Sequence, residues 1–225
     1  MLANIVFEFF IKGGPVMWPI LISALVAVAV VGERIFWWLR ESGKREPQKL
    51  EQVLAALENA DTQSARQIAA GSSDPVVRMI HHGLEHLGHA HKSMLGALQL
   101  AAGLELKRAG RFLTVMDTLV TLAPLLGLLG TVTGLMRAFL NIGSAELSVS
   151  AVTGGIGEAL IATACGLGIA IFALIPFNYF SARVAQLQFD LETAATNVEV
   201  MVGAGNMGDG VHLRQPSAPN QATSH

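Results

Sequence analysis

The sequence predicts an all-α membrane protein with three transmembrane helices and long helical extensions into the cytoplasm. Of its 225 residues, 52% are hydrophobic and only 14% are charged, and the mean hydropathy is +0.48. An average soluble domain carries roughly a quarter charged residues, so this chain lacks the charged surface of a water-soluble protein. Three uncharged runs are each long enough to cross a bilayer as a helix, which takes about 20 residues. No long segment alternates between polar and apolar residues, so we expect no strands.

The three uncharged runs locate the predicted spans. The first run lacks the basic start and the cleavage site of a signal peptide, so we interpret it as an uncleaved anchor. Trp37 and Trp38 follow it, as expected of aromatic side chains at a membrane interface. The uncharged runs cover residues 13–32, 118–136 and 159–182.

The basic residues predict the orientation of the chain. Cytoplasmic loops of membrane proteins carry an excess of Lys and Arg, and eleven of the fifteen Lys and Arg residues lie between the first two spans. This loop is therefore expected in the cytoplasm, with the N-terminus outside and the C-terminus inside after three crossings. The eleven are Arg34, Arg40, Lys44, Arg45, Lys49, Arg66, Arg78, Lys92, Lys107, Arg108 and Arg111.

The segments between and after the spans are expected to be helical up to a disordered tail. Asp61 starts a short helix, and Asp74-Pro75 places an N-cap before a proline at the first helical position, opening a helix to about Gly88. From about Ser93 the pattern contains no strong breaker, so one long helix is expected to run into the second span. The tail is rich in Gly, Pro, Ser and Asn, which predicts disorder.

These assignments divide the chain into eight expected segments. They are a periplasmic N-terminus (1–12), a first transmembrane helix (13–38), a cytoplasmic helical domain (39–111), a second transmembrane helix (112–140), a periplasmic loop (141–147), a third transmembrane helix (148–182), a cytoplasmic helical extension (183–202) and a disordered tail (203–225).

Glu158 is the leading candidate for chemistry. It is the only Asp, Glu, His, Lys or Arg between Glu146 and Arg183, and it lies in or at the start of the third span. An ionised side chain at the bilayer centre costs roughly 2.5–3.5 kcal/mol on insertion scales, and such residues usually face a bundle interior or a wet cavity and often relay protons. The alternative is an interfacial glutamate at the outer end of the helix.

Small residues form a stripe on each of the second and third spans. Such stripes allow membrane helices to approach closely, so helix packing is the simplest explanation. Threonines occur beside these stripes, and threonine hydroxyls in membrane helices often bond only to their own backbone. The packing candidates are Gly127, Gly130, Gly134, Ala159 and Gly166, and the threonines are Thr131, Thr133 and Thr163.

The remaining composition excludes most other functions. The net charge of −2 gives no reason to expect nucleic-acid binding, and a single cysteine, Cys165, excludes an internal disulfide. The sequence contains no phosphate-binding loop, nucleophile elbow or zinc-protease motif, so we expect no enzymatic activity and no cofactor. Five histidines between His81 and His91 lack a typical set of partner ligands, so a solvated helical face is favoured over a metal site. The five are His81, His82, His86, His89 and His91.

Three segments resemble the MotA/TolQ/ExbB proton-channel family, and in particular its three-span ExbB and TolQ branch. They are APLLGLLGTVTGLMRAF (123–139), GIGEALIATACGLGIAIFALIPFNYF (155–180) and, more loosely, the GGPVMWPILI stretch with the later Glu-Arg pair at the start of the chain. The match covers the second and third spans almost continuously.

The resemblance implies a homopentameric ring in the bacterial inner membrane, with the second and third spans lining a central lumen. It also implies an ExbD- or TolR-like single-span partner in that lumen and a TonB- or TolA-like transducer. The family's glutamate corresponds to Glu158 and its threonines correspond to Thr131 and Thr163. Together these residues are the expected proton pathway.

Other functions remain open from the sequence. A structural membrane scaffold, in which Glu158 only bonds a neighbouring helix, is one alternative, and a metal-handling protein that uses the histidines is another. A stator for another envelope or motility machine is a third, although flagellar stator subunits typically have four spans.

The orientation can be tested by labelling single cysteines in intact cells with a membrane-impermeant maleimide. In a Cys165→Ser background, Ile5→Cys should label and Ala60→Cys should label only after the cells are permeabilised, because the positive-inside rule puts the basic loop in the cytoplasm. Labelling of residue 60 but not of residue 5 in intact cells would reverse the assigned topology.

Overall fold

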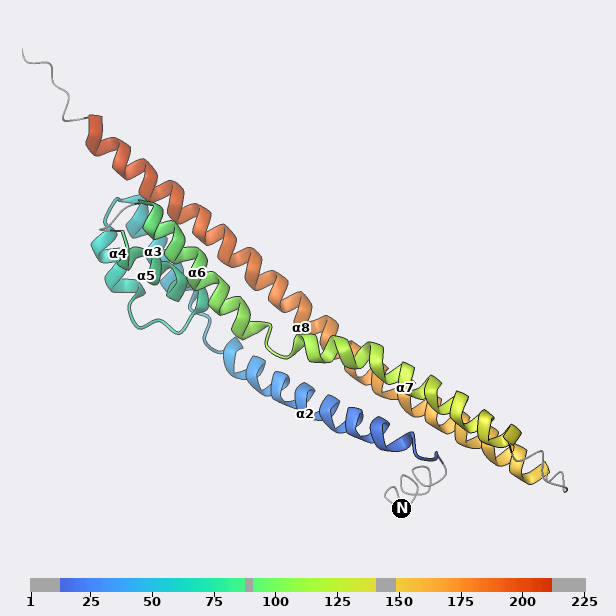
Figure 1. Cartoon of the computed structure of the whole chain (residues 1–225). Coiled ribbons are helices and arrows are strands. Elements are labelled where there is room, and N and C mark those ends of the chain that lie inside the picture. The colour runs from blue at the N-terminus through green and yellow to red at the C-terminus, as the bar shows by residue number, and fades with distance from the viewer. Residues whose placement is uncertain (1–12, 88–90, 141–148, 212–225) are drawn as a thin grey trace, which may run out of the picture. The chain divides into compact units, whose positions relative to one another are not determined.

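The computed structural model describes residues 13–87, 91–140 and 149–211 (Figure 1). The regular structure of these residues is entirely helical, and no strand occurs among them. This confirms the predicted all-α class. The chain divides into two compact units: unit 1 comprises the segment up to Ser42 together with Gly110–Val184, and unit 2 comprises Gly43–Ala109 together with the segment from Ala185.

Unit 1 contains the apolar helices. They are α2 (Met17–Ser42), α7 (Leu113–Leu140) and the first part of α8 (Val149–Val211). Three stretches are long and apolar enough to cross a membrane, namely Met17–Ser42, Leu113–Leu140 and Val152–Gly203. The prediction of three transmembrane helices is therefore confirmed.

Helix α8 is one continuous helix of 63 residues, far longer than a bilayer crossing requires. It continues to Val211, so the tail predicted to be disordered from residue 203 begins as helix, and residues 212–225 lie outside the described part of the chain. Extending an existing helix by one residue is much easier than nucleating a new one. This explains why a glycine-rich composition did not end the helix at Gly203. The predicted N-terminal segment 1–12 and the whole of the predicted periplasmic loop 141–147 also lie outside the described residues.

Helix α2 packs against α7 and α8 through three small apolar clusters. Along α2, the residue numbers of the contacting α8 side chains increase and those of the contacting α7 side chains decrease. Helix α2 therefore runs parallel to α8 and antiparallel to α7. From one end to the other, the clusters join Ile20 to Ala162, Ala27 to Leu119 and Ala173, and Val31 to Met116 and Phe180.

Helices α7 and α8 lie side by side in unit 1 and approach through small residues (Figure 1). A Cβ atom at Gly130 would overlap the methyl group of Ala162, and one at Gly166 would overlap the carbonyl oxygen of Ala123. At Gly134 a Cβ would lie 2.9 Å from the carbonyl oxygen of Gly155. The two backbones are thus too close for side chains larger than hydrogen at these positions. Gly127 belongs to the same row, with the Thr163 Cα 3.0 Å from its Cβ position.

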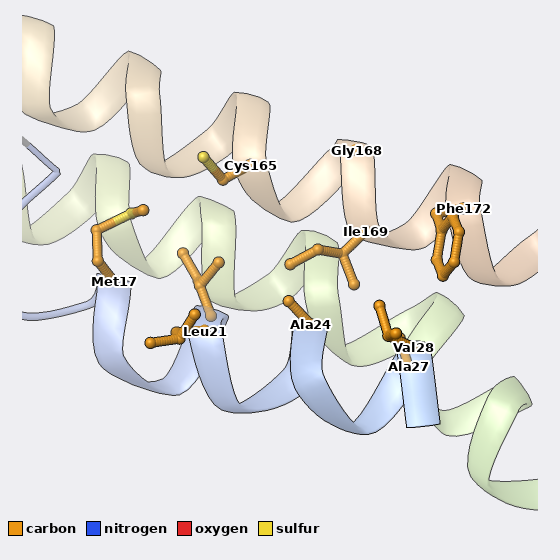
Figure 2. A pocket seen from close by; sticks show the side chains of 10 residues that line it. Met17, Leu21, Ala24, Ala27, Val28, Cys165, Gly168, Ile169 and Phe172 are labelled. Carbon is orange, nitrogen blue, oxygen red and sulfur yellow. The ribbon is translucent and has the colours of Figure 1, made fainter. Parts of the chain in front are cut away.

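An apolar groove of about 470 Å³ follows the seam between α2 and α8 (Figure 2). Met17 and Leu21 line it from α2, and Ile169 and Phe172 line it from α8. No charged side chain lines this groove. Its lining is apolar apart from Cys165, so the charged groups of unit 1 lie elsewhere.

Unit 2 contains four short helices and the later part of α8. Both predicted helix starts and the predicted N-cap at Asp74 are confirmed: Asp61 accepts a hydrogen bond from the Ser64 backbone N–H at 2.9 Å, and Asp74 accepts one from the Val76 N–H at 2.8 Å. The bonds from Ser64 hold the pKa of the Asp61 carboxyl below its usual range. The four helices are α3 (Pro47–Glu58), α4 (Thr62–Ala69), α5 (Pro75–Glu85) and α6 (His91–Ala109).

The expectation of one long helix running into the second span is wrong. Helix α6 ends at Ala109 and α7 begins at Leu113, with Phe112 in the left-handed region at φ 64°. A left-handed residue cannot continue a right-handed helix. Gly110, a poor helix former, precedes it. The interruption was hidden from sequence analysis because phenylalanine rarely adopts this conformation.

The α7–α8 contact predicts a loss of stability for alanine at one glycine of α8 and no such loss at a neighbouring glycine. Gly166→Ala should lower the free energy of unfolding by about 1–3 kcal/mol, because the new methyl group overlaps the backbone of α7. Gly168→Ala is the matched control, since no atom lies within 4 Å of its Cβ position. Equilibrium unfolding in mixed detergent micelles measures both. Equal stability of the two variants would contradict the close contact.

Candidate functional site

Glu158 lies on α8, immediately before the uncharged run that ends at Ala182. Its position is more than two helical turns after the helix begins at Val149. Its side chain is 20% exposed, which is low for a carboxylate among apolar helices. The sequence left open whether Glu158 is inside the membrane or at the outer end of the span. In the structure it lies within the continuous helix α8, beside Gly14 just before α2 and beside Arg137 in the last turn of α7, and its depth in a membrane stays open.

The first of these contacts is an ion pair across the α7–α8 interface. Arg137 Nη1 donates a hydrogen bond to Glu158 Oε1 at 3.0 Å, and the Arg137 side chain is 48% exposed. An ionised carboxylate is costly in an apolar environment unless it is paired and hydrogen-bonded. Arg137 supplies the pairing charge from the last turn of α7.

The second contact is with the chain just before α2. A Cβ atom at Gly14 would overlap the Glu158 carboxyl group, so this carboxyl lies directly against the Gly14 backbone. Gly14 has a φ of 72°, a conformation that side-chain-bearing residues rarely adopt. Both the space and the backbone angle therefore require glycine here. The result is a carboxylate enclosed by all three apolar segments of unit 1.

The threonines divide into one that bridges helices and others that do not. Thr163 Oγ1 lies 3.0 Å from the Gly127 carbonyl oxygen on α7 and 3.2 Å from the Ala159 carbonyl oxygen on its own helix. Thr131 Oγ1 donates to the Leu128 carbonyl oxygen at 2.7 Å, within α7. Thr133 likewise bonds only to carbonyl oxygens of α7. Thr163 thus joins the α7–α8 interface about one and a half turns along α8 from Glu158.

Sequence analysis missed Arg137 and Gly14 as parts of the site. In the sequence, Arg137 directly follows the second uncharged run and Gly14 is one residue of the first. The role of Arg137 depends on the antiparallel register of α7 and α8, and that of Gly14 depends on how the chain enters α2. Both are tertiary features that the sequence does not record locally.

The histidine cluster does not form a metal site in the described residues. No group of three potential ligands is close enough to hold an ion among them. His82 Nδ1 lies 3.5 Å from a carboxylate oxygen of Glu85, and His86 Nδ1 lies 2.9 Å from the His82 carbonyl oxygen. His89 and the side chain of His91 lie outside the described residues.

Comparison with known proteins identifies the family. The sequence profile of the MotA/TolQ/ExbB proton channel family matches residues 71–193, a stretch that contains Arg137 and Glu158. The chain belongs to this family.

Named relatives agree with this assignment. The Synechocystis biopolymer transport protein ExbB-like 1 is 41% identical over 183 residues, which cover 79% of this chain and 71% of the relative. The ExbB-like 3 protein of the same organism is 36% identical over 171 residues, covering 75% and 81%. The Tol-Pal system protein TolQ of Haemophilus influenzae is 37% identical over 100 residues, covering 44% of each chain.

Family membership sets the broad functional class. The chain is a member of a proton channel family, which is a family of transport subunits and not of enzymes. Its three apolar helices make it a multi-pass membrane protein. Glu158 and Arg137 belong to two of these apolar helices, and Gly14 lies just before the third.

The threonine geometry predicts unequal contributions to stability. Thr163→Val should lower the free energy of unfolding by about 1 kcal/mol, because it removes a hydrogen bond between two membrane helices and keeps the side-chain shape. Thr131→Val should cost less, since its hydroxyl bonds only within α7. Unfolding in mixed micelles compares the two variants. An equal or larger loss for Thr131→Val would show that the Thr163 bond does not hold α7 and α8 together.

Proposed function

We propose that this chain is the proton-conducting channel subunit of an inner-membrane motor that uses the proton-motive force to energise a TonB- or Tol-like transducer. One observation carries the proposal. The Glu158 carboxylate is held among three apolar segments, where an ionisable group is expensive unless it serves a purpose. The names of the relatives, which include biopolymer transport proteins and a Tol-Pal system protein, support the same class of machine.

In this mechanism Glu158 is the proton carrier. A proton that enters from one side of the membrane converts the carboxylate to the neutral acid, and its release to the other side restores the charge. One elementary charge that crosses a potential of 100 mV releases about 2.3 kcal/mol. A few protons therefore suffice for a mechanical step against a weakly bound load. Thr131 and Thr163 are proposed to line the same pathway.

A ring of five copies with an ExbD- or TolR-like single-span protein in its lumen is part of this proposal. Helices α7 and α8 expose a large apolar surface that a single subunit does not cover. In a ring, part of this surface contacts neighbouring subunits and part faces lipid. The exposed side chains include Leu125, Leu128, Val132, Leu160, Leu167 and Ile171. We propose the orientation with the N-terminus in the periplasm and the C-terminus in the cytoplasm.

A structural scaffold is the second candidate, and the ion pair between Arg137 and Glu158 is the observation that favours it. Fixing the register of two membrane helices is a sufficient role for a salt bridge between them. In that case a neutral glutamine at residue 158 would weaken assembly without affecting proton movement. The two candidates therefore differ in what Glu158→Gln does.

Glu158→Gln tests the proton carrier directly. The substitution keeps the volume but cannot titrate, so proton flux that depends on this chain should fall to background in energised membrane vesicles of the native host. Energised transport should be lost with it. Glu192→Gln is the matched control, because Glu192 is an exposed residue of α8 in unit 2 that bonds Gln188.

Both variants should reach the membrane in wild-type amounts, since a neutral amide is less costly in the bilayer than an ionised carboxylate. Wild-type flux in Glu158→Gln would overturn the mechanism. Reduced assembly with flux per assembled complex unchanged would establish the scaffold instead.

A further inference from the structure

The proton carrier of this chain has a permanent cation beside it. Arg137 comes from α7 and Glu158 from α8, and their side-chain atoms lie 3.0 Å apart. An arginine remains charged at any pH that a cell experiences. The pair is therefore fully ionised whenever Glu158 is deprotonated, and it becomes a lone guanidinium whenever Glu158 is protonated.

Among the described residues, Arg137 is the charged side chain that contacts Glu158. From α8 itself, the thiol of Cys165 and the phenol of Tyr179 are the only other ionisable side chains between Val149 and Ala182, and no other Asp, Glu, His, Lys or Arg occurs there. The segment before α2 presents the bare backbone of Gly14. The other charged residue of α7, Asp117, is near the opposite end of that helix. Lys12 and Glu146 lie outside the described residues.

The geometry also limits where the carboxylate can point. The Gly14 backbone closes one side of the carboxyl, because even a Cβ atom would not fit there. The guanidinium occupies the α7 side at hydrogen-bond distance. About half of the Arg137 side chain is exposed, so the guanidinium is not locked in place by packing.

We propose that Arg137 is a positioning residue that holds the Glu158 carboxylate between proton transfers and thereby sets the pH range in which the chain conducts. The proposal rests on Glu158 being the proton carrier. Protonation of the carboxylate gives the neutral acid and releases its attraction to the guanidinium. Loss of the same proton to water on the other side restores the carboxylate and its pairing with Arg137. Arg137 itself gains and loses no proton.

A cation beside a carboxyl group favours the ionised carboxylate over the neutral acid. Removal of the Arg137 charge therefore favours the neutral acid. Arg137→Gln should therefore move the pH profile of proton flux toward higher pH. Arg137→Lys keeps the charge and should keep the profile close to that of the wild type. The measurement is proton flux into membrane vesicles of the native host across a series of pH values, normalised to the amount of assembled protein.

Arg183→Gln is the matched control, because Arg183 lies at the other end of the uncharged run and bonds the Tyr179 hydroxyl at 3.2 Å. It should leave the pH profile unchanged.

If Arg137→Gln fails to assemble, Arg137→Lys and Arg137→His still test the proposal. Histidine loses its charge near neutral pH, so Arg137→His should conduct with a changed pH profile.

The outcomes separate this proposal from the proposed function. A wild-type pH profile in Arg137→Gln, with flux that Glu158→Gln still abolishes, would overturn the role of Arg137 and keep Glu158 as the carrier. Wild-type flux in Glu158→Gln would overturn both. A fall in assembled protein with an unchanged profile would assign Arg137 a purely structural role.

Discussion

The close contact between α7 and α8 is the constraint on which the site depends. Gly130 and Gly134 of α7 have no room for a side chain against α8, and Gly166 has none against α7. Such contacts fix the antiparallel register of the two helices, because a shift by one residue would place larger side chains at the crossing. That register brings the last turn of α7 beside Glu158. A membrane helix pair held by larger side chains would leave the carboxylate farther from any cation.

The same contact explains how a charged group is tolerated among apolar helices. The Arg137 guanidinium supplies the opposite charge at 3.0 Å, and the Gly14 backbone encloses the carboxyl on another side. An ion pair of this kind is only weak evidence for stability, because desolvation of both groups offsets most of the attraction. The weak contribution of such a pair to stability is consistent with the proposal that it takes part in proton transfer.

The sequence was sufficient for the helical class, the three spans and the helix starts at Asp61 and Asp74, whereas Glu158 as the proton carrier stays a prediction. These features depend on local composition and periodicity, which a sequence records directly. The sequence did not predict the break between α6 and α7 at Phe112, because the left-handed backbone conformation there is unusual for phenylalanine. It was also insufficient for Arg137 and Gly14, since their roles arise from tertiary contacts with a residue far along the chain.

The central claim is that Glu158 takes up and releases a proton while it lies beside Arg137. Infrared spectroscopy of the purified full-length protein in lipid nanodiscs, titrated over pH, measures this directly. The account predicts a carboxylic-acid band that appears and disappears reversibly with pH in the wild type and is absent from Glu158→Gln. A titration in which Glu158→Gln removes no carboxylic-acid band at any pH would contradict the account.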